Sequence, residues 1–214
     1  MTSHKLRNTV LLACALLYGM AAHGDTIYDE SVSGDLSNSG LTPTLMTVLL
    51  GSNDVFGATG KSATTGTIDR DYFTFTVPQD LYLTAITVLP GTQTLGALGD
   101  SFIGIESGPQ VTVSTAATTA AGLLGWFHYN TGDINEDILP MMGTSGLGST
   151  GFSAPLPAGT YSFWVQEASV GTVNYGLEFT VATPEPATWT MMLTGLTALV
   201  GKTARRVARS RLHG

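Results

Sequence analysis

Charged residues and cysteine are both scarce in this chain of 214 residues. Asp, Glu, Lys and Arg together make up only 12% of the sequence, and Cys14 is the one cysteine. The low charge content excludes a coiled coil, a long helical bundle and a charge-rich disordered protein, because all three need many charged side chains. A lone cysteine has no partner in the chain, so an intramolecular disulfide is excluded as well. The composition is that of a globular protein held together by apolar packing.

Basic residues are scarcer still once the two ends of the chain are set aside. Between residues 25 and 183 there are 15 acidic residues but only two basic ones, Lys61 and Arg70, which gives this stretch a net charge of −13. Nucleic acids and anionic lipid surfaces bind through clusters of cationic side chains, which release counterions from the phosphates. Neither is therefore expected as a partner of this region.

Residues 1–24 have the pattern of a secretory signal peptide. A basic start is followed by an apolar run over residues 9–22 and by a small-x-small cleavage site at Ala22-His23-Gly24. Cleavage there makes Asp25 the first residue of the exported chain, which then contains no cysteine. In the alternative interpretation, as a lipoprotein, Cys14 carries a lipid.

The C-terminal segment, residues 183–214, has three parts in a fixed order. Pro184-Glu185-Pro186 is followed by an apolar stretch, residues 187–201, which is about 22 Å long as a helix. Extension to about residue 204 or local thinning of the bilayer brings it near the roughly 30 Å of hydrocarbon that a transmembrane helix crosses. Five basic residues at the end keep the C-terminus on the cytoplasmic side: Lys202, Arg205, Arg206, Arg209 and Arg211.

This tail resembles the PEP-CTERM sorting signal of Gram-negative bacteria that secrete exopolysaccharide. The resemblance rests on Pro184, Glu185 and Pro186, the apolar segment beginning near Trp189, and the terminal basic cluster. It implies that an exosortase, a membrane-embedded cysteine transpeptidase-like enzyme, recognises and removes the tail. The protein would be anchored transiently in the inner membrane through its C-terminal helix and then reach the cell surface or extracellular matrix, with exopolysaccharide as a further partner. The alternative is an ordinary C-terminal anchor.

Residues 25–182 are predicted to form an all-β domain, an antiparallel two-sheet β-sandwich of eight or nine strands. Apolar and polar residues alternate over residues 72–77, 160–166 and 173–181, as in strands with one buried face, and residues 81–88 follow the first of these after a turn. Weaker patterns predict strands at residues 45–50, 102–106, 111–114 and 123–129. Because each strand has one apolar face, each sheet needs a second sheet to cover it.

Three segments of this region resemble the opening, penultimate and final strands of bacterial pre-peptidase C-terminal domains: residues 69–78, 156–165 and 174–181. Those domains are small jelly-roll-like β-sandwiches appended to secreted enzymes, and the resemblance implies a binding rather than a catalytic role. The Gly/Thr/Ala-rich middle of this chain, residues 112–151, departs from that family.

No catalytic residue is predicted. Gly99-Asp100-Ser101-Phe102 is similar to a nucleophile block of one esterase family, whose serine needs a histidine base from an Asp-x-x-His segment. His128 is the only histidine between residues 25 and 183, and Gly125 stands where the aspartate would be. A serine without an oriented base is a poor nucleophile. A non-enzymatic protein is therefore expected.

The best metal candidate is a calcium loop. Asp133, Asn135 and Asp137 place oxygen ligands at positions 1, 3 and 5 of such a loop. Ile138 replaces the glycine at position 6, and Thr144 replaces the glutamate at position 12, so a solvated acidic loop is the alternative. No other cofactor is predicted.

Asp69 and Asp71 lie two residues apart at the entrance of a predicted strand, so both side chains point to one side if the strand is regular. A turn followed by a strand start is the preferred interpretation of this pair, and a binding site is the alternative.

Three aromatic residues, Trp126, Tyr129 and Trp164, are predicted to form a platform that stacks on sugar rings. Trp164 shares its strand face with Ser162 and Gln166, which predicts partial exposure. Aromatic residues that cap the edge of the core are the alternative. The expected function is a secreted, non-enzymatic surface or matrix protein of the exopolysaccharide layer, structural or adhesive. The alternative is a glycan-binding module or a glycan-active enzyme.

Overall fold

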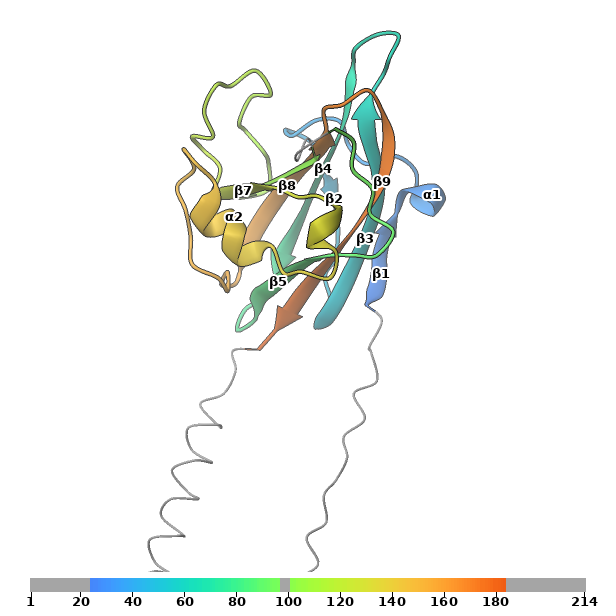
Figure 1. The fold of residues 1–214 in the computed structure, drawn as a ribbon. Helices are drawn as coiled ribbons and strands as arrows, with labels where there is room; N and C mark the ends of the chain where they lie inside the picture. Colours follow the sequence, from blue (N-terminus) through green and yellow to red (C-terminus); the bar gives the residue numbers. More distant parts are fainter. Residues whose placement is uncertain (1–23, 97–100, 184–214) are drawn as a thin grey trace, which may run out of the picture.

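The computed structural model describes residues 24–96 and 101–183, which form a β-rich fold with short helical segments (Figure 1). The strands are β1 (Asp25–Asp29), β2 (Thr44–Leu45), β3 (Gly51–Lys61), β4 (Ile68–Val77), β5 (Tyr82–Val88), β6 (Ser101–Ser107), β7 (Gly125–His128), β8 (Gly159–Glu167) and β9 (Gly171–Ala182). The helical segments are α1 (Glu30–Ser33), the 3₁₀ turn η1 (Thr131–Asp133) and α2 (Leu139–Ser145).

The strands form one curled sheet in the order β5-β9-β3-β4-β8-β6-β7, in which neighbours are antiparallel. Two short strands add parallel pairs, β1 beside β3 and β2 beside β4. The strands β3 and β4 pair only next to their hairpin, at Gly60 with Asp69 and at Lys61 with Ile68. Beyond that point the sheet divides into one half with β1, β3, β5 and β9 and another with β2, β4, β6, β7 and β8.

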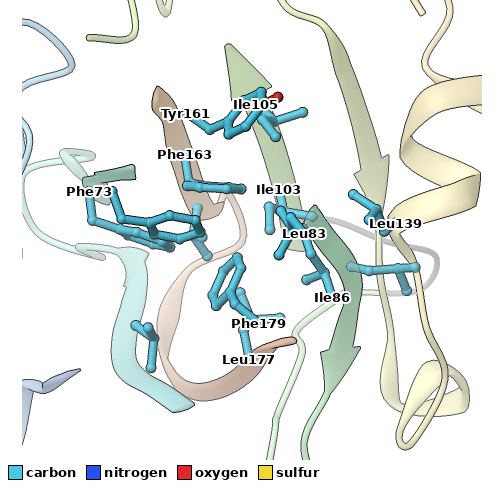
Figure 2. Packing of buried hydrophobic residues seen from close by; sticks show 14 of the residues in the cluster. Phe73, Leu83, Ile86, Ile103, Ile105, Leu139, Tyr161, Phe163, Leu177 and Phe179 are labelled. Carbon is cyan, nitrogen blue, oxygen red and sulfur yellow. The ribbon is translucent and has the colours of Figure 1, made fainter. Parts of the chain in front are cut away.

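The core lies where these two halves face each other. Phe73 and Phe75 from β4 and Phe163 from β8 meet Phe179 from β9, with ring centroids between 4.9 and 5.7 Å apart. Figure 2 shows Phe73, Phe163 and Phe179 in this core. All four side chains are fully buried. Burial of each contributes on the order of 2 kcal/mol, so this aromatic group is a main source of the stability of the domain.

The structure confirms the predicted all-β class and most of the predicted strands. The alternating segments at residues 72–77, 160–166 and 173–181 lie in β4, β8 and β9, residues 82–88 form β5, and residues 102–106 lie in β6. Nine strands occur in the described residues, within the predicted range.

Three weaker strand predictions need correction. Only Thr44 and Leu45 of the region around residues 45–50 lie in a strand, residues 111–114 form no strand, and β7 is shorter than predicted. In the 111–114 segment, the carboxylate of Glu106 accepts the backbone N–H groups of Thr112 and Val113, so a side chain takes donors that a ladder would use.

Strands β1 and β3 were not predicted. The sequence of β3 has three glycines and no regular alternation, and the strand is paired on both sides, with β1 and with β9. Gly57 illustrates the reason: a Cβ atom there would lie 2.5 Å from the Tyr175 hydroxyl and 2.8 Å from an Asp71 carboxylate oxygen. The strand carries glycine where two side chains of other strands approach its backbone.

The predicted signal peptide, the Pro184-Glu185-Pro186 motif, the transmembrane helix at about 187–204 and the basic cluster lie outside the described residues. Within residues 24–96 and 101–183, no helix is long and apolar enough to cross a membrane. The described part of the chain starts and ends at the same end of the sheet, because Asp25 pairs with Asn53 of β3 and Val181 of β9 pairs with Gly51 (Figure 1).

Candidate functional site

Aromatic side chains gather on the outer face of the half that contains β4, β6, β7 and β8. Along a strand, side chains alternate between the two faces, so Tyr72 and Trp164 point away from the core that Phe73 and Phe163 fill. The Tyr72 and Trp164 rings stack at 5.7 Å, and Phe102 from β6 packs edge-on against Trp164 at 5.0 Å. Trp126 from β7 stacks on Phe102 at 6.0 Å.

A shallow cavity of about 280 Å³ lies over these rings. Phe102, Trp126, His128 and Trp164 line it on the sheet side, and residues of the segment 113–120 line it on the other; we call it the aromatic groove. Among the described residues that line it, none is Asp, Glu, Lys or Arg. The buried Glu106 carboxylate holds the start of the 113–120 wall through the Thr112 backbone N–H, 2.8 Å away.

The three predicted platform residues have different positions. Trp126 is partly exposed and lines the groove. Trp164 lines its floor but is only 7% exposed, so the predicted partial exposure is wrong; Phe102 and the neighbouring Tyr72 cover the ring. Tyr129 is 1% exposed and belongs to the main core, one position beyond His128 and hence on the opposite face. Phe102 and His128 take part in the groove and were not predicted for it.

Within the predicted calcium loop, the two carboxylates have structural hydrogen bonds. Asp133 accepts the backbone N–H of Asn130 at 2.8 Å in a reciprocal capping arrangement. Asp137 Oδ1 accepts the backbone N–H groups of Ile86 and Leu139. Asn135 has a φ of 68°, a left-handed conformation typical of a turn. These contacts explain the acidic residues as anchors of a turn, while calcium binding by this loop stays a prediction.

The residues of the esterase-like block also have other contacts. Ser101 Oγ donates a hydrogen bond to the buried Glu167 carboxylate at 2.7 Å. His128 Nδ1 lies 3.2 Å from the carbonyl oxygen of Ser101, not from its hydroxyl. The structure therefore gives Ser101 a role in holding Glu167.

A second feature was not predicted as a site. Glu30, at the start of α1, Asp35 in the following loop and Asp71 on β4 each bring a carboxylate oxygen within 4.8 Å of the others; we call these three residues the acidic cluster. A cavity of about 580 Å³ opens beside Glu30 and Asp35. Asp71 is far from Glu30 and Asp35 in the sequence, and the sequence analysis considered only the Asp69/Asp71 pair as a site.

Asp71 is the buried member of the acidic cluster. Its side chain is on the core-facing side of β4 and is 0% exposed. Oδ2 accepts a hydrogen bond from the Tyr175 hydroxyl of β9 at 2.7 Å, whereas Oδ1 has no hydrogen-bond partner. Burial, followed by the charge of Glu30, raises the pKa of Asp71 to about 8.

Glu30 is half-buried and is fixed by the backbone. Its Oε1 accepts the N–H of Leu36 and its Oε2 accepts the N–H of Ala58, both at 2.7 Å. Burial raises the pKa of Glu30 although these two hydrogen bonds lower it, and the charges of Asp35 and Asp69 raise it further. The cluster thus holds carboxyl groups close together in a partly dry environment, where repulsion between their ionised forms is strong.

No known protein family, no curated protein and no solved structure matches this chain. The function is therefore inferred from the residues and from the geometry of these two sites.

Proposed function

We propose that this chain is an exported, non-enzymatic protein of the cell surface or exopolysaccharide matrix, which adheres to neutral polysaccharide through the aromatic groove. The observation that carries the proposal is a groove lined by aromatic rings and free of charged side chains, on a domain with a net charge of −13. We also infer that the curled sheet is a jelly-roll-like two-sheet β-sandwich, as expected of a secreted binding domain.

The ring faces in the groove suit a sugar. Carbohydrate rings present C–H groups that pack on flat aromatic faces, and such contacts are favourable without any charge. The indole N–H of Trp126 donates to the Leu147 carbonyl at 3.1 Å, and that of Trp164 donates to Gln166 at 3.1 Å. Because these N–H groups already have acceptors, the rings are held in place before a ligand binds, which reduces the entropy lost on binding.

Charge favours a neutral polysaccharide over an acidic one. The groove supplies no lysine or arginine to pair with a uronic acid or sulfate, and the acidic surface of the domain repels polyanions. Ser114, Thr118 and Thr119 on the opposite wall offer hydroxyl groups that exchange hydrogen bonds with sugar hydroxyls.

The acidic cluster does not favour the alternative of a glycan-active enzyme. Both oxygens of Glu30 are held by backbone N–H groups, and Asp71 is completely buried. A glycosidase acid and nucleophile must both reach the scissile bond, which these two carboxylates do not.

The sorting tail supports export to this layer. Its Pro184-Glu185-Pro186 motif, apolar segment and basic cluster fit removal by an exosortase in the inner membrane. Mass spectrometry of the exported protein checks this step: the expected chain starts at Asp25 and lacks the basic cluster. An intact tail on the exported protein, in a host with a working exosortase, contradicts it.

Retention on the host's exopolysaccharide tests adhesion. The full chain in detergent is run through gels that contain neutral or acidic fractions of that polysaccharide. We expect retardation by neutral fractions only, and Trp126→Ala should weaken it about fivefold to tenfold because a stacking face is lost. Trp126→Phe keeps a ring and should retain most binding, and Leu49→Ala, an exposed apolar change outside the groove, is the matched control. Equal retardation of all variants, or depolymerisation of the gel, overturns the proposal.

A further inference from the structure

We propose that Glu30, Asp35 and Asp71 form a divalent-cation site suited to Ca²⁺, which ties the segment after β1 to both halves of the sheet. Two observations carry this inference: three carboxylate oxygens lie within 4.8 Å of one another, and the buried Asp71 Oδ1 has no hydrogen-bond partner. The site is independent of the aromatic groove, and it is separate from the loop at residues 133–137.

Asp71 Oδ1 is buried and has no hydrogen-bond partner. A buried carboxylate oxygen without a hydrogen bond is unfavourable, so native proteins nearly always provide it with a donor or an ion. The adjacent Arg70 does not do so, because its side chain donates to Gln166 Oε1 at 2.9 Å and to the Ile68 carbonyl at 3.3 Å. Since Lys61 and Arg70 are the only lysine or arginine residues between 25 and 183, an external cation is the remaining charge partner that the chemistry of this site favours.

The spacing favours Ca²⁺ over Mg²⁺. Three oxygens around a Ca²⁺ ion at about 2.4 Å lie roughly 3.4 to 4.2 Å apart, so the oxygens of the acidic cluster need only a small contraction to contact it. Around Mg²⁺, at about 2.1 Å in a strict octahedron, adjacent oxygens are only about 3.0 Å apart, so the contraction needed is larger. Water from the adjoining cavity can supply the other ligands of either ion, because Ca²⁺ takes six to eight oxygens.

The ligands are held in position by the protein itself. The Tyr175 hydroxyl fixes Asp71 at 2.7 Å, and the backbone N–H groups of Leu36 and Ala58 fix Glu30. Asp35, in the loop after α1, is exposed and completes the cluster from the solvent side. Such outer contacts orient ligands before the ion binds.

The residues of the acidic cluster belong to, or contact, both halves of the sheet. Asp71 is on β4, in one half of the sheet, whereas Glu30 contacts β3, in the other half, through Ala58. Binding of the ion therefore links the two halves and the segment 30–36. We expect Ca²⁺ to raise the melting temperature, since a ligand that binds only the folded state stabilises it.

Calorimetric titration of the full chain in detergent, after removal of metal with EGTA, tests the site. We expect one Ca²⁺ per chain, with Mg²⁺ binding at least about tenfold weaker. Asp71→Asn and Asp35→Asn should each weaken Ca²⁺ binding by at least about tenfold, because each removes one anionic ligand. Asp35 is exposed, so Asp35→Asn keeps the test valid even if the buried change impairs folding.

Two matched controls identify the site. Asp80→Asn changes an exposed turn acid with a φ of 65°, a conformation that asparagine tolerates, and it should leave Ca²⁺ binding unchanged. Asp133→Asn should also leave binding unchanged. Absence of Ca²⁺ binding, or binding that is lost in Asp133→Asn and kept in Asp35→Asn, overturns the proposal.

Discussion

Glu167, at the end of β8, and Asp71, near the start of β4, are buried carboxylates on the core-facing side of the same half-sheet. They differ in the number of hydrogen bonds that they accept. Both are 0% exposed. Glu167 accepts three hydrogen bonds, from the backbone N–H groups of Leu95 and Ser169 and from the Ser101 hydroxyl. Asp71 accepts one, from Tyr175, and keeps one oxygen without a partner. Burial alone therefore does not separate a structural acid from a ligand; the number of donors does.

The two acids also connect different segments of the fold. Glu167 joins the end of β8 to Leu95, in the connection that follows β5, and to the first residue of β6, so hydrogen-bond donors of the protein stabilise its carboxylate. The partner of Asp71 on the facing half-sheet is a single hydroxyl, and its other neighbours in the acidic cluster carry the same charge. Glu167 is satisfied by the protein, whereas one oxygen of Asp71 has no donor in the protein.

The largest expected effect comes from the core on which both acids depend. Phe163→Ala removes a fully buried ring that contacts Phe73, Phe75 and Phe179, and should lower the free energy of unfolding by about 3 to 5 kcal/mol. Urea denaturation followed by tryptophan fluorescence measures it. A loss below about 1 kcal/mol means that the two half-sheets do not share this core.

Glu167→Gln should be the next largest change. Glutamine has one acceptor oxygen and turns its NH₂ group toward a backbone N–H of Leu95 or Ser169, which leaves buried donors unpaired. We expect a loss of about 1 to 3 kcal/mol in urea denaturation, with or without Ca²⁺. Glu136→Gln, an exposed matched change, should alter stability by less than about 0.5 kcal/mol. Equal effects of the two substitutions contradict the structural role of Glu167.

Asp71→Asn should have the opposite sign in EGTA. Above about pH 8, where Asp71 is ionised, the amide removes a buried negative charge beside Glu30 and keeps an acceptor for the Tyr175 hydroxyl, so the metal-free protein should gain about 1 to 2 kcal/mol. With saturating Ca²⁺ the order should reverse, because only the wild type binds the ion. If Asp71→Asn is less stable than the wild type in EGTA, then the Asp71 carboxyl group stabilises the fold as that of Glu167 does, and this prediction is wrong.

The same residue gives the metal-free wild type a distinct pH dependence. The pKa of Asp71 is about 8 in the folded protein, against an ordinary value of 3.8, so the folded state holds a proton that the unfolded state has released. Stability contributed by this proton is complete below about pH 4 and is lost as the pH rises to about 8. Denaturation in EGTA at several pH values should show that loss in the wild type and a smaller one in Asp71→Asn.

The sequence predicted the parts of this molecule that depend on local alternation. The inward faces of β4, β8 and β9 followed from period-two patterns. Trp126, one of the predicted platform residues, is partly exposed and lines the aromatic groove, whereas Tyr129 is buried in the core. A shift of one residue along β7 reverses the face, and the pattern did not fix that register.

The acidic cluster was not predictable from the sequence, because its residues come together only in the tertiary structure. Glu30 and Asp71 meet only because the segment after β1 lies beside β3, and the β1–β3 pair is parallel and non-local. The donors that satisfy Glu167 also come from distant segments. Local spacing instead favoured Asp133, Asn135 and Asp137, where two of the three side chains anchor a turn. Counting hydrogen-bond donors around a carboxylate requires tertiary structure.

The smallest expected effect belongs to Asp35→Asn, and it makes the sharpest distinction between structure and ligand. Asp35 is exposed, so in EGTA its neutralisation should change the free energy of unfolding by less than about 0.5 kcal/mol. In Ca²⁺, the variant should show most of the Asp71→Asn loss of ion-induced stabilisation, because both residues contact the same ion. Paired thermal melts in EGTA and Ca²⁺ compare the two responses. If Asp35→Asn keeps the full wild-type response to Ca²⁺, the ion does not bind at the acidic cluster, and the spare oxygen of Asp71 has another explanation.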